Sequence, residues 1–82
     1  MQFEYKTRGT SSQSILFEIN DGIVQNVHFI GGCHGNLQGI AKLVEDMDAE
    51  EVIERINGIR CGMKPTSCPD QLAKAIKEAL GK

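Results

Sequence analysis

The sequence predicts an α+β fold, a three-stranded antiparallel sheet followed by three helices that pack on one of its faces. Two observations predict this order. Apolar and polar residues alternate through the first third of the chain, whereas beyond it apolar residues recur every three or four positions. Strands followed by helices are typical of α+β domains. With 82 residues and no linker or repeat, the chain is expected to form one domain, residues 1–82.

Three segments are predicted as strands, at residues 3–5, 15–19 and 24–30. Each is rich in β-branched or aromatic residues that alternate with polar neighbours. Asn20-Asp21-Gly22 separates the second segment from the third, and Asp-Gly between two such runs is typical of a hairpin turn. The three segments therefore predict an antiparallel meander.

Three helices are predicted in the rest of the chain. The first carries an apolar face over residues 37–44. The second begins after Asp48, which has a glutamate three residues later as in a capping box, and ends at Asn57-Gly58. Pro69 fits the first position of the third helix, which makes Cys68 its expected N-cap.

Charge and hydropathy exclude several classes of protein. Nine Lys and Arg against eleven Asp and Glu give a net charge of −2, so no strongly basic face for nucleic acid or an anionic membrane is expected. No apolar run approaches the roughly 20 residues of a membrane span, and the N-terminal residues lack the pattern of a signal peptide. We therefore expect a cytoplasmic protein with reduced thiols.

The three cysteines, Cys33, Cys61 and Cys68, are the main candidates for chemistry. An odd number in a reducing compartment indicates metal ligands or reactive thiols more than disulfides. Cys33 follows two glycines where a strand becomes a helix, which should expose its thiol, and the glycines around it permit nucleotide binding without demonstrating it. Cys68 at a helix start should have a lowered pKa, to which Lys64 could contribute. Cys61 matches no standard spacing, and a partly buried loop cysteine is about equally expected.

Three thiolates together suit a soft cation, so the cysteines predict a zinc or iron–sulfur site. Structural zinc takes four ligands, and Ser11, His34, Asp70 or water are the candidates for the fourth. The simpler interpretations are an exposed surface role for His34 and a favourable helix-dipole charge for Asp70. A metal-binding accessory or scaffold module with a protein partner, a second copy of the chain included, is the leading hypothesis.

Two alternatives stay open from the residues alone. In the first, the chain is a thiol redox or transfer protein in which Cys68 attacks as a thiolate and Cys61 or Cys33 resolves the product. In the second, it is a non-catalytic interaction domain with incidental cysteines.

Three motifs resemble the TSCPD domain family. Thr66-Ser67-Cys68-Pro69-Asp70 spells its signature, and Gly31-Gly32-Cys33-His34-Gly35-Asn36-Leu37 and Gly58-Ile59-Arg60-Cys61-Gly62 extend the resemblance over nearly the whole chain. The chain looks like the short, stand-alone, four-cysteine branch, which is related to the C-terminal domain of adenosylcobalamin-dependent ribonucleotide reductases. Relatives carry Gly-Thr-Cys-Ser in the loop where this chain has Gly9-Thr10-Ser11-Ser12, so Ser11 stands at the expected fourth cysteine. The resemblance implies an accessory domain, and ribonucleoside-diphosphate reductase activity would belong to the longer relatives.

The order of elements is also similar to that of iron–sulfur cluster scaffold proteins. In that family the ligands lie in the loop between the first two strands, at the corner between third strand and first helix, and at the start of the last helix. These places correspond to Ser11, Cys33 and Cys68. The resemblance implies a scaffold-like fold, by analogy alone.

Overall fold

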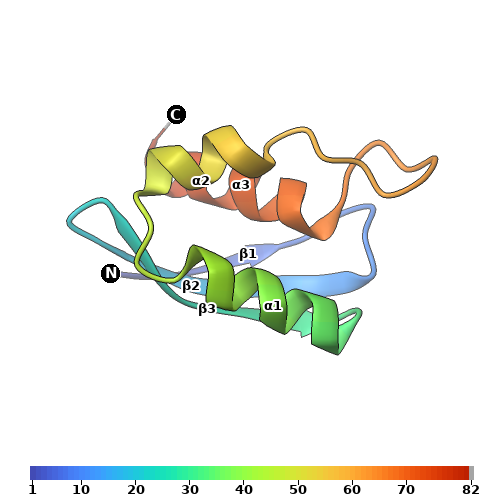
Figure 1. Cartoon of the computed structure of the whole chain (residues 1–82), viewed down its shortest axis with the longest axis horizontal. Coiled ribbons are helices and arrows are strands. Elements are labelled where there is room, and N and C mark those ends of the chain that lie inside the picture. The colour runs from blue at the N-terminus through green and yellow to red at the C-terminus, as the bar shows by residue number, and fades with distance from the viewer. Residues whose placement is uncertain (82) are drawn as a thin grey trace.

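In a computed structural model of the chain, which describes residues 1–81, three strands precede three helices (Figure 1). The strands form one antiparallel sheet in the order β1-β2-β3, so the predicted α+β arrangement is confirmed. None of the helices within the described residues has the length and apolar character to cross a membrane. The elements are β1 (Gln2–Lys6), β2 (Ser12–Asn20), β3 (Ile23–Gly31), α1 (His34–Val44), α2 (Ala49–Ile56) and α3 (Cys68–Ala79).

A two-residue turn, Asp21-Gly22, closes the hairpin of β2 and β3. Both turn residues have positive φ, 53° and 77°, which is the backbone that the twist of a tight hairpin favours. On the other side of β2, Phe3 lies opposite Phe17 in the ladder, and the two rings stack with their centroids 5.4 Å apart. The predicted meander is therefore present, with its register fixed by the turn and by inward aromatic residues.

One face of the sheet and the apolar sides of the helices share a single core. α1 packs along β3, whereas α2 and α3 pack against each other above the sheet (Figure 1). On the other face of the sheet Leu16 and Ile30 keep 39% and 42% of their surface exposed. The helices thus cover one face, as predicted. The core residues are Ile15, Phe17, Val24, Val27, Val44, Ala49, Val52, Ile53, Leu72, Ala75 and Ile76.

The helix starts agree with the sequence pattern at α2 and differ from it at α3. The Asp48 side chain accepts a hydrogen bond from the backbone N–H of Glu51, which caps α2 as predicted. At α3 the prediction that Cys68 is the N-cap was wrong by one residue. Ser67 is the cap, its hydroxyl accepting from the backbone N–H of Asp70, and Cys68 is the first helical residue. A serine oxygen accepts such a bond far better than a thiol, which explains the difference.

Candidate functional site

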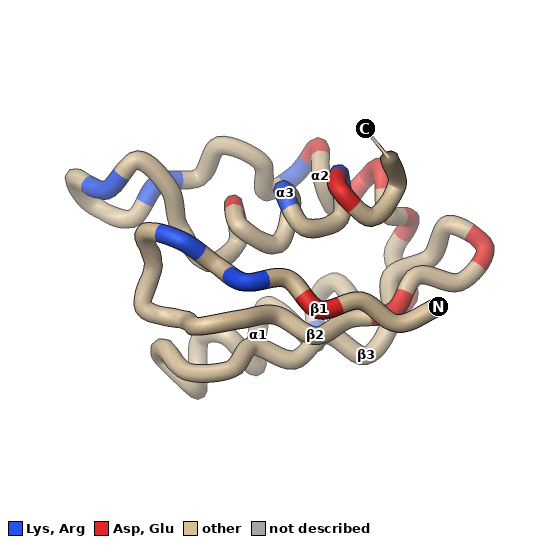
Figure 2. Tube along the Cα trace, turned by 180° about the vertical axis from the view of Figure 1, so that it is seen from behind, with Lys and Arg blue, Asp and Glu red and all other residues tan. Residues whose placement is uncertain are grey.

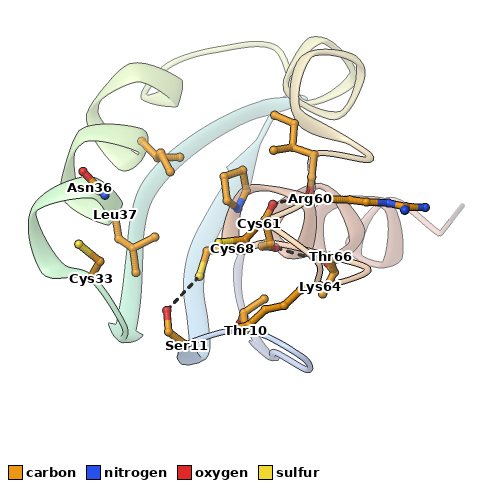
Figure 3. A pocket seen from close by; sticks show the side chains of 14 residues that line it. Thr10, Ser11, Cys33, Asn36, Leu37, Arg60, Cys61, Lys64, Thr66 and Cys68 are labelled. Atoms are coloured by element: carbon orange, nitrogen blue, oxygen red, sulfur yellow. Dashed lines mark hydrogen bonds between the residues drawn. The ribbon is translucent and has the colours of Figure 1, made fainter.

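A pocket of about 460 Å³ opens at the end of the molecule where three connecting segments meet. The segments are the β1–β2 loop, the corner between β3 and α1, and the α2–α3 loop with the start of α3 (Figure 1). Each of them contributes chemistry-bearing side chains: Ser11 from the first, Cys33 from the second, and Cys61 and Cys68 from the third (Figure 3). The fold therefore gathers the three cysteines and Ser11 around one cavity.

Cys68 is the cysteine whose surroundings are most specialised. Only 9% of its surface is exposed, and its Sγ atom lies 3.2 Å from the hydroxyl oxygen of Ser12 and 3.9 Å from that of Ser11. Burial alone would raise the pKa of the Cys68 thiol, but hydrogen bonds from the side chain and backbone of Ser12, and from Thr10 and Ser11, lower it below its ordinary value. The pocket therefore favours the thiolate form of Cys68, the form that binds metal or attacks electrophiles.

Gly32 permits the close approach that brings the β1–β2 loop to this thiol. Its φ is +83°, and a Cβ atom added there would lie 2.8 Å from the Leu37 side chain and 3.1 Å from the Ser11 hydroxyl. A side chain would therefore push apart the corner and the loop. The next residue, Cys33, is the N-cap residue of α1, and within the described chain its thiol caps no helix amide. Cys33 is exposed at the rim of the pocket, as its glycine-rich surroundings predict.

Asp70 anchors the α2–α3 loop through buried hydrogen bonds, and it does not line the pocket. Its carboxylate is 1% exposed and accepts hydrogen bonds from the backbone N–H of Gly58 at 2.6 Å, from the Thr66 hydroxyl, and from Lys74 Nζ at 2.7 Å. Burial would raise the pKa of Asp70, but the bonds from Lys74, Thr66 and Gly58 hold it below its usual value. Asp70 lies in the first turn of α3, where the sequence places a favourable helix-dipole charge, and it is also a buried anchor of the loop.

Gln71 and Thr66 extend this anchor to the β1–β2 loop. The Gln71 amide donates to the Thr66 hydroxyl at 3.0 Å, and its oxygen accepts from the backbone N–H of Arg8 at 3.0 Å. Gly9, with φ +74°, lets the same loop pass close to Thr66, where a Cβ would lie 3.1 Å from its methyl group. The sequence pattern did not predict the bracing roles of Gln71 and Thr66. Arg8 and Gln71 are 63 positions apart, and no local pattern links them. The two loops of the pocket are therefore braced against the start of α3.

His34 lies outside the pocket. It is the first residue of α1, exposed, with its Nε2 atom 2.8 Å from the side-chain nitrogen of Gln38. The simpler interpretation of this histidine, a surface residue, agrees with its position. Of the candidate fourth ligands, only Ser11 lines the cavity with the cysteines.

The thiols of the pocket are of the type that a soft metal prefers, but their sulfur atoms do not surround one common point where an ion could bind. Among residues 1–81 no three His, Cys, Asp or Glu side chains lie close enough together to hold an ion. In Figure 3 Cys68 points towards Ser11, whereas Cys33 stands apart on the α1 side of the pocket. Cys33 and Cys61 are exposed, so their side chains can change rotamer without disturbing the core. The pocket therefore offers one ordered thiolate and two adjustable thiols.

Comparison with known proteins identifies one family. The TSCPD domain matches residues 3–80, nearly the whole chain. Neither the search of curated proteins nor the search of solved structures found a match. The chain therefore belongs to the TSCPD domain family.

Proposed function

We propose that the chain is a small accessory module that binds zinc or an iron–sulfur cluster through thiolates in this pocket. The observation that carries the proposal is that Cys33, from the corner between β3 and α1, and Cys61 and Cys68, from the α2–α3 loop and the start of α3, line one cavity. Thiolates are the ligands that zinc and iron–sulfur clusters prefer. A bound metal would cross-link the segments that meet there, which is a large gain for so small a core.

Cys68 would be the first ligand and the two exposed cysteines would follow. Its hydroxyl neighbours lower its pKa, so a metal displaces the proton of Cys68 more easily than that of an ordinary cysteine. Cys33 and Cys61 are exposed, so their side chains have room to turn. Closing the site requires their side chains to turn towards Cys68.

Ser11 supports a site with three thiolates and one open position. Its hydroxyl oxygen lies 3.9 Å from Cys68 Sγ, and two sulfurs on one tetrahedral zinc ion, with bonds of about 2.3 Å, are about 3.8 Å apart. Position 11 is therefore at ligand distance from Cys68. Because a serine hydroxyl is a poor ligand for a soft metal, water or an external ligand would take the fourth place.

The accessory role is drawn from the resemblance to the C-terminal domain of adenosylcobalamin-dependent ribonucleotide reductases. We place the module in the cytoplasm, where its thiols stay reduced, and expect it to act on a protein partner, which could be a second copy of the chain.

Metal titration tests the proposal. Reduced, metal-free protein should bind one equivalent of cobalt(II) with the absorption bands of thiolate coordination, and zinc should displace it. Cys68→Ala should lower the affinity most, and Cys33→Ala and Cys61→Ala should each lower it. The matched control is His34→Gln, a nearby donor outside the pocket, which should bind as the parent does. Absence of a thiolate band, or equal loss in the control, would falsify the proposal.

The surroundings of Cys68 favour a second candidate, a thiol redox protein. The Cys68 thiolate would attack a disulfide, forming a mixed disulfide and releasing one partner thiolate. The thiolate of Cys61 or Cys33 would then attack the Cys68 sulfur, releasing the second thiolate and leaving an internal disulfide. The lowered pKa of Cys68 supports this reading. Metal-free protein after anaerobic purification, with rapid formation of an internal disulfide, would favour it over the metal module.

A further inference from the structure

Two cations line the pocket that holds the three thiols. Arg60 and Lys64 come from the α2–α3 loop, and no Asp or Glu within the described residues lines the cavity. Figure 2 shows Lys and Arg gathered at this end of the molecule, over the α2–α3 loop and the end of β1, and most Asp and Glu towards the other end. A chain with a net charge of −2 thus presents a positive end around its pocket.

These cations have no carboxylate partner inside the described part of the chain. The salt bridges there lie within α2 and within α3, and neither includes Arg60 or Lys64. Ser67 and Cys68, at the positive end of the α3 dipole, line the same cavity. The pocket is therefore complementary to a negative charge.

The remaining wall is apolar. Leu37 and Ile40 of α1 face the cavity, with Ile59 and Pro69 on the other side. A volume of about 460 Å³ lies within the roughly 300–1,000 Å³ of small-molecule pockets. A bare inorganic anion would leave this wall in contact with water, whereas an anion with an apolar body would cover it.

We propose that the pocket binds a small organic anion, an apolar body with a carboxylate, sulfonate or phosphate head held by Arg60 and Lys64. In Figure 3 the Arg60 side chain runs outward, away from Cys33 and Ser11, so this exposed side chain would turn inward to pair its planar guanidinium with the two oxygens of such a head. The proposal rests on the proposed function only in taking this pocket as the working site.

Two probes of the same size test the charge preference. Reduced, metal-free protein labelled with ¹⁵N is titrated with 2-naphthalenesulfonate and with uncharged 2-naphthalenemethanol while amide chemical shifts are followed. We expect the sulfonate to bind about tenfold more tightly, from about threefold for each exposed cation, with the largest shifts in the β1–β2 and α2–α3 loops. The preference should shrink in high salt, because both cations are exposed. Equal binding of the alcohol, shifts centred elsewhere, or no binding at millimolar concentration would overturn the proposal.

A pair of double variants removes the same charge inside and outside the pocket. Arg60→Gln with Lys64→Gln should abolish the preference for the sulfonate, and Lys42→Gln with Arg55→Gln should keep it. All four side chains are exposed, so both proteins should retain the parent amide spectrum elsewhere. Retention of the preference in the first variant, or its loss in the second, counts against the proposal.

The sulfonate titration and the metal titration together separate this inference from the metal proposal. Sulfonate preference in a protein that takes no cobalt or zinc supports the anion pocket and removes the metal module. Stoichiometric zinc without any sulfonate preference does the reverse.

Discussion

Replacing Ser11 by cysteine should convert the proposed three-thiolate site into a four-thiolate site. The serine oxygen lies 3.9 Å from Cys68 Sγ, close to the separation of about 3.8 Å between two sulfurs on one zinc ion. The new thiol therefore needs no movement of the loop. It would also lie beside hydroxyl groups that already favour a thiolate at Cys68.

The expected gain follows from typical zinc energetics. Structural zinc sites with four ligands contribute about 10–16 kcal/mol, or roughly 3 kcal/mol per ligand, and every 1.4 kcal/mol is about tenfold in affinity. Ser11→Cys should thus bind zinc about 100-fold more tightly than the parent. At a fixed free zinc concentration well above both Kd values, this adds about 2.7 kcal/mol to stability, or about 10–20 °C in Tm.

Competition with a chromophoric chelator, under a reductant that does not bind zinc, measures this gain. Ser14→Cys is the matched control, because it adds a thiol three residues further along, in β2, at a residue that does not line the pocket. If Ser11→Cys binds zinc no more tightly than the parent, or if Ser14→Cys gains as much, position 11 is not a ligand position and the assignment of the site is wrong.

The remaining predictions concern the braces around the pocket. Gly32→Ala should lower the free energy of unfolding by about 2–4 kcal/mol, because its φ is positive and the added Cβ overlaps its neighbours. Gly35→Ala, in α1 with open space around the added Cβ, should raise the free energy of unfolding by about 0.5–1 kcal/mol. Urea unfolding measures both, and equal effects of the two variants would contradict the reasoning. Asp70→Asn should cost about 1–3 kcal/mol at neutral pH. Because the folded-state pKa of Asp70 is lowered, the stability it provides is present above about pH 4 and is lost as pH falls through the folded pKa, so the variant should show a flatter acid limb than the parent. Ser12→Ala should raise the pKa of Cys68 and slow its alkylation at pH 7, followed by mass spectrometry of the Cys68 peptide; an unchanged pH–rate profile would show that this hydroxyl does not support the thiolate.

The parts of the fold that local chemistry decides were predictable from the sequence. Asp21-Gly22 required a turn with positive φ, and Asp48 had its glutamate partner three residues on. The start of α3 was misplaced by one residue because Pro69 fits either of the first two helical positions, and the choice depends on whether Ser67 or Cys68 is the better acceptor.

The site was predictable where the residue type carries the chemistry, and not where distant partners do. Cysteines at a strand end and at a helix start suggested a common pocket, and the fold places them there. The role of Asp70 was not accessible, because its partners include Gly58, whose position depends on the packing of α2 against α3. Arg60 was missed because an arginine in a polar loop has no pattern that separates a pocket residue from a solvated one.

Four of the five signature residues of this family divide into a structural part and a chemical part. Thr66 and Asp70 hold the loop, Ser67 begins α3, and Cys68 alone directs a reactive atom to the pocket. Cys68→Ala should therefore lose metal binding or thiol chemistry while the fold persists, since the Ser12 hydroxyl keeps Thr10 as a partner and the Asp70 anchor makes no bond to the sulfur. Asp70→Asn should weaken the fold and the site together, because the amide keeps one acceptor oxygen and loses the bond from Gly58 or those from Thr66 and Lys74. Loss of function in an Asp70 variant is thus no evidence that the carboxylate touches a ligand, whereas the same loss in a folded Cys68 variant is direct evidence for the thiolate.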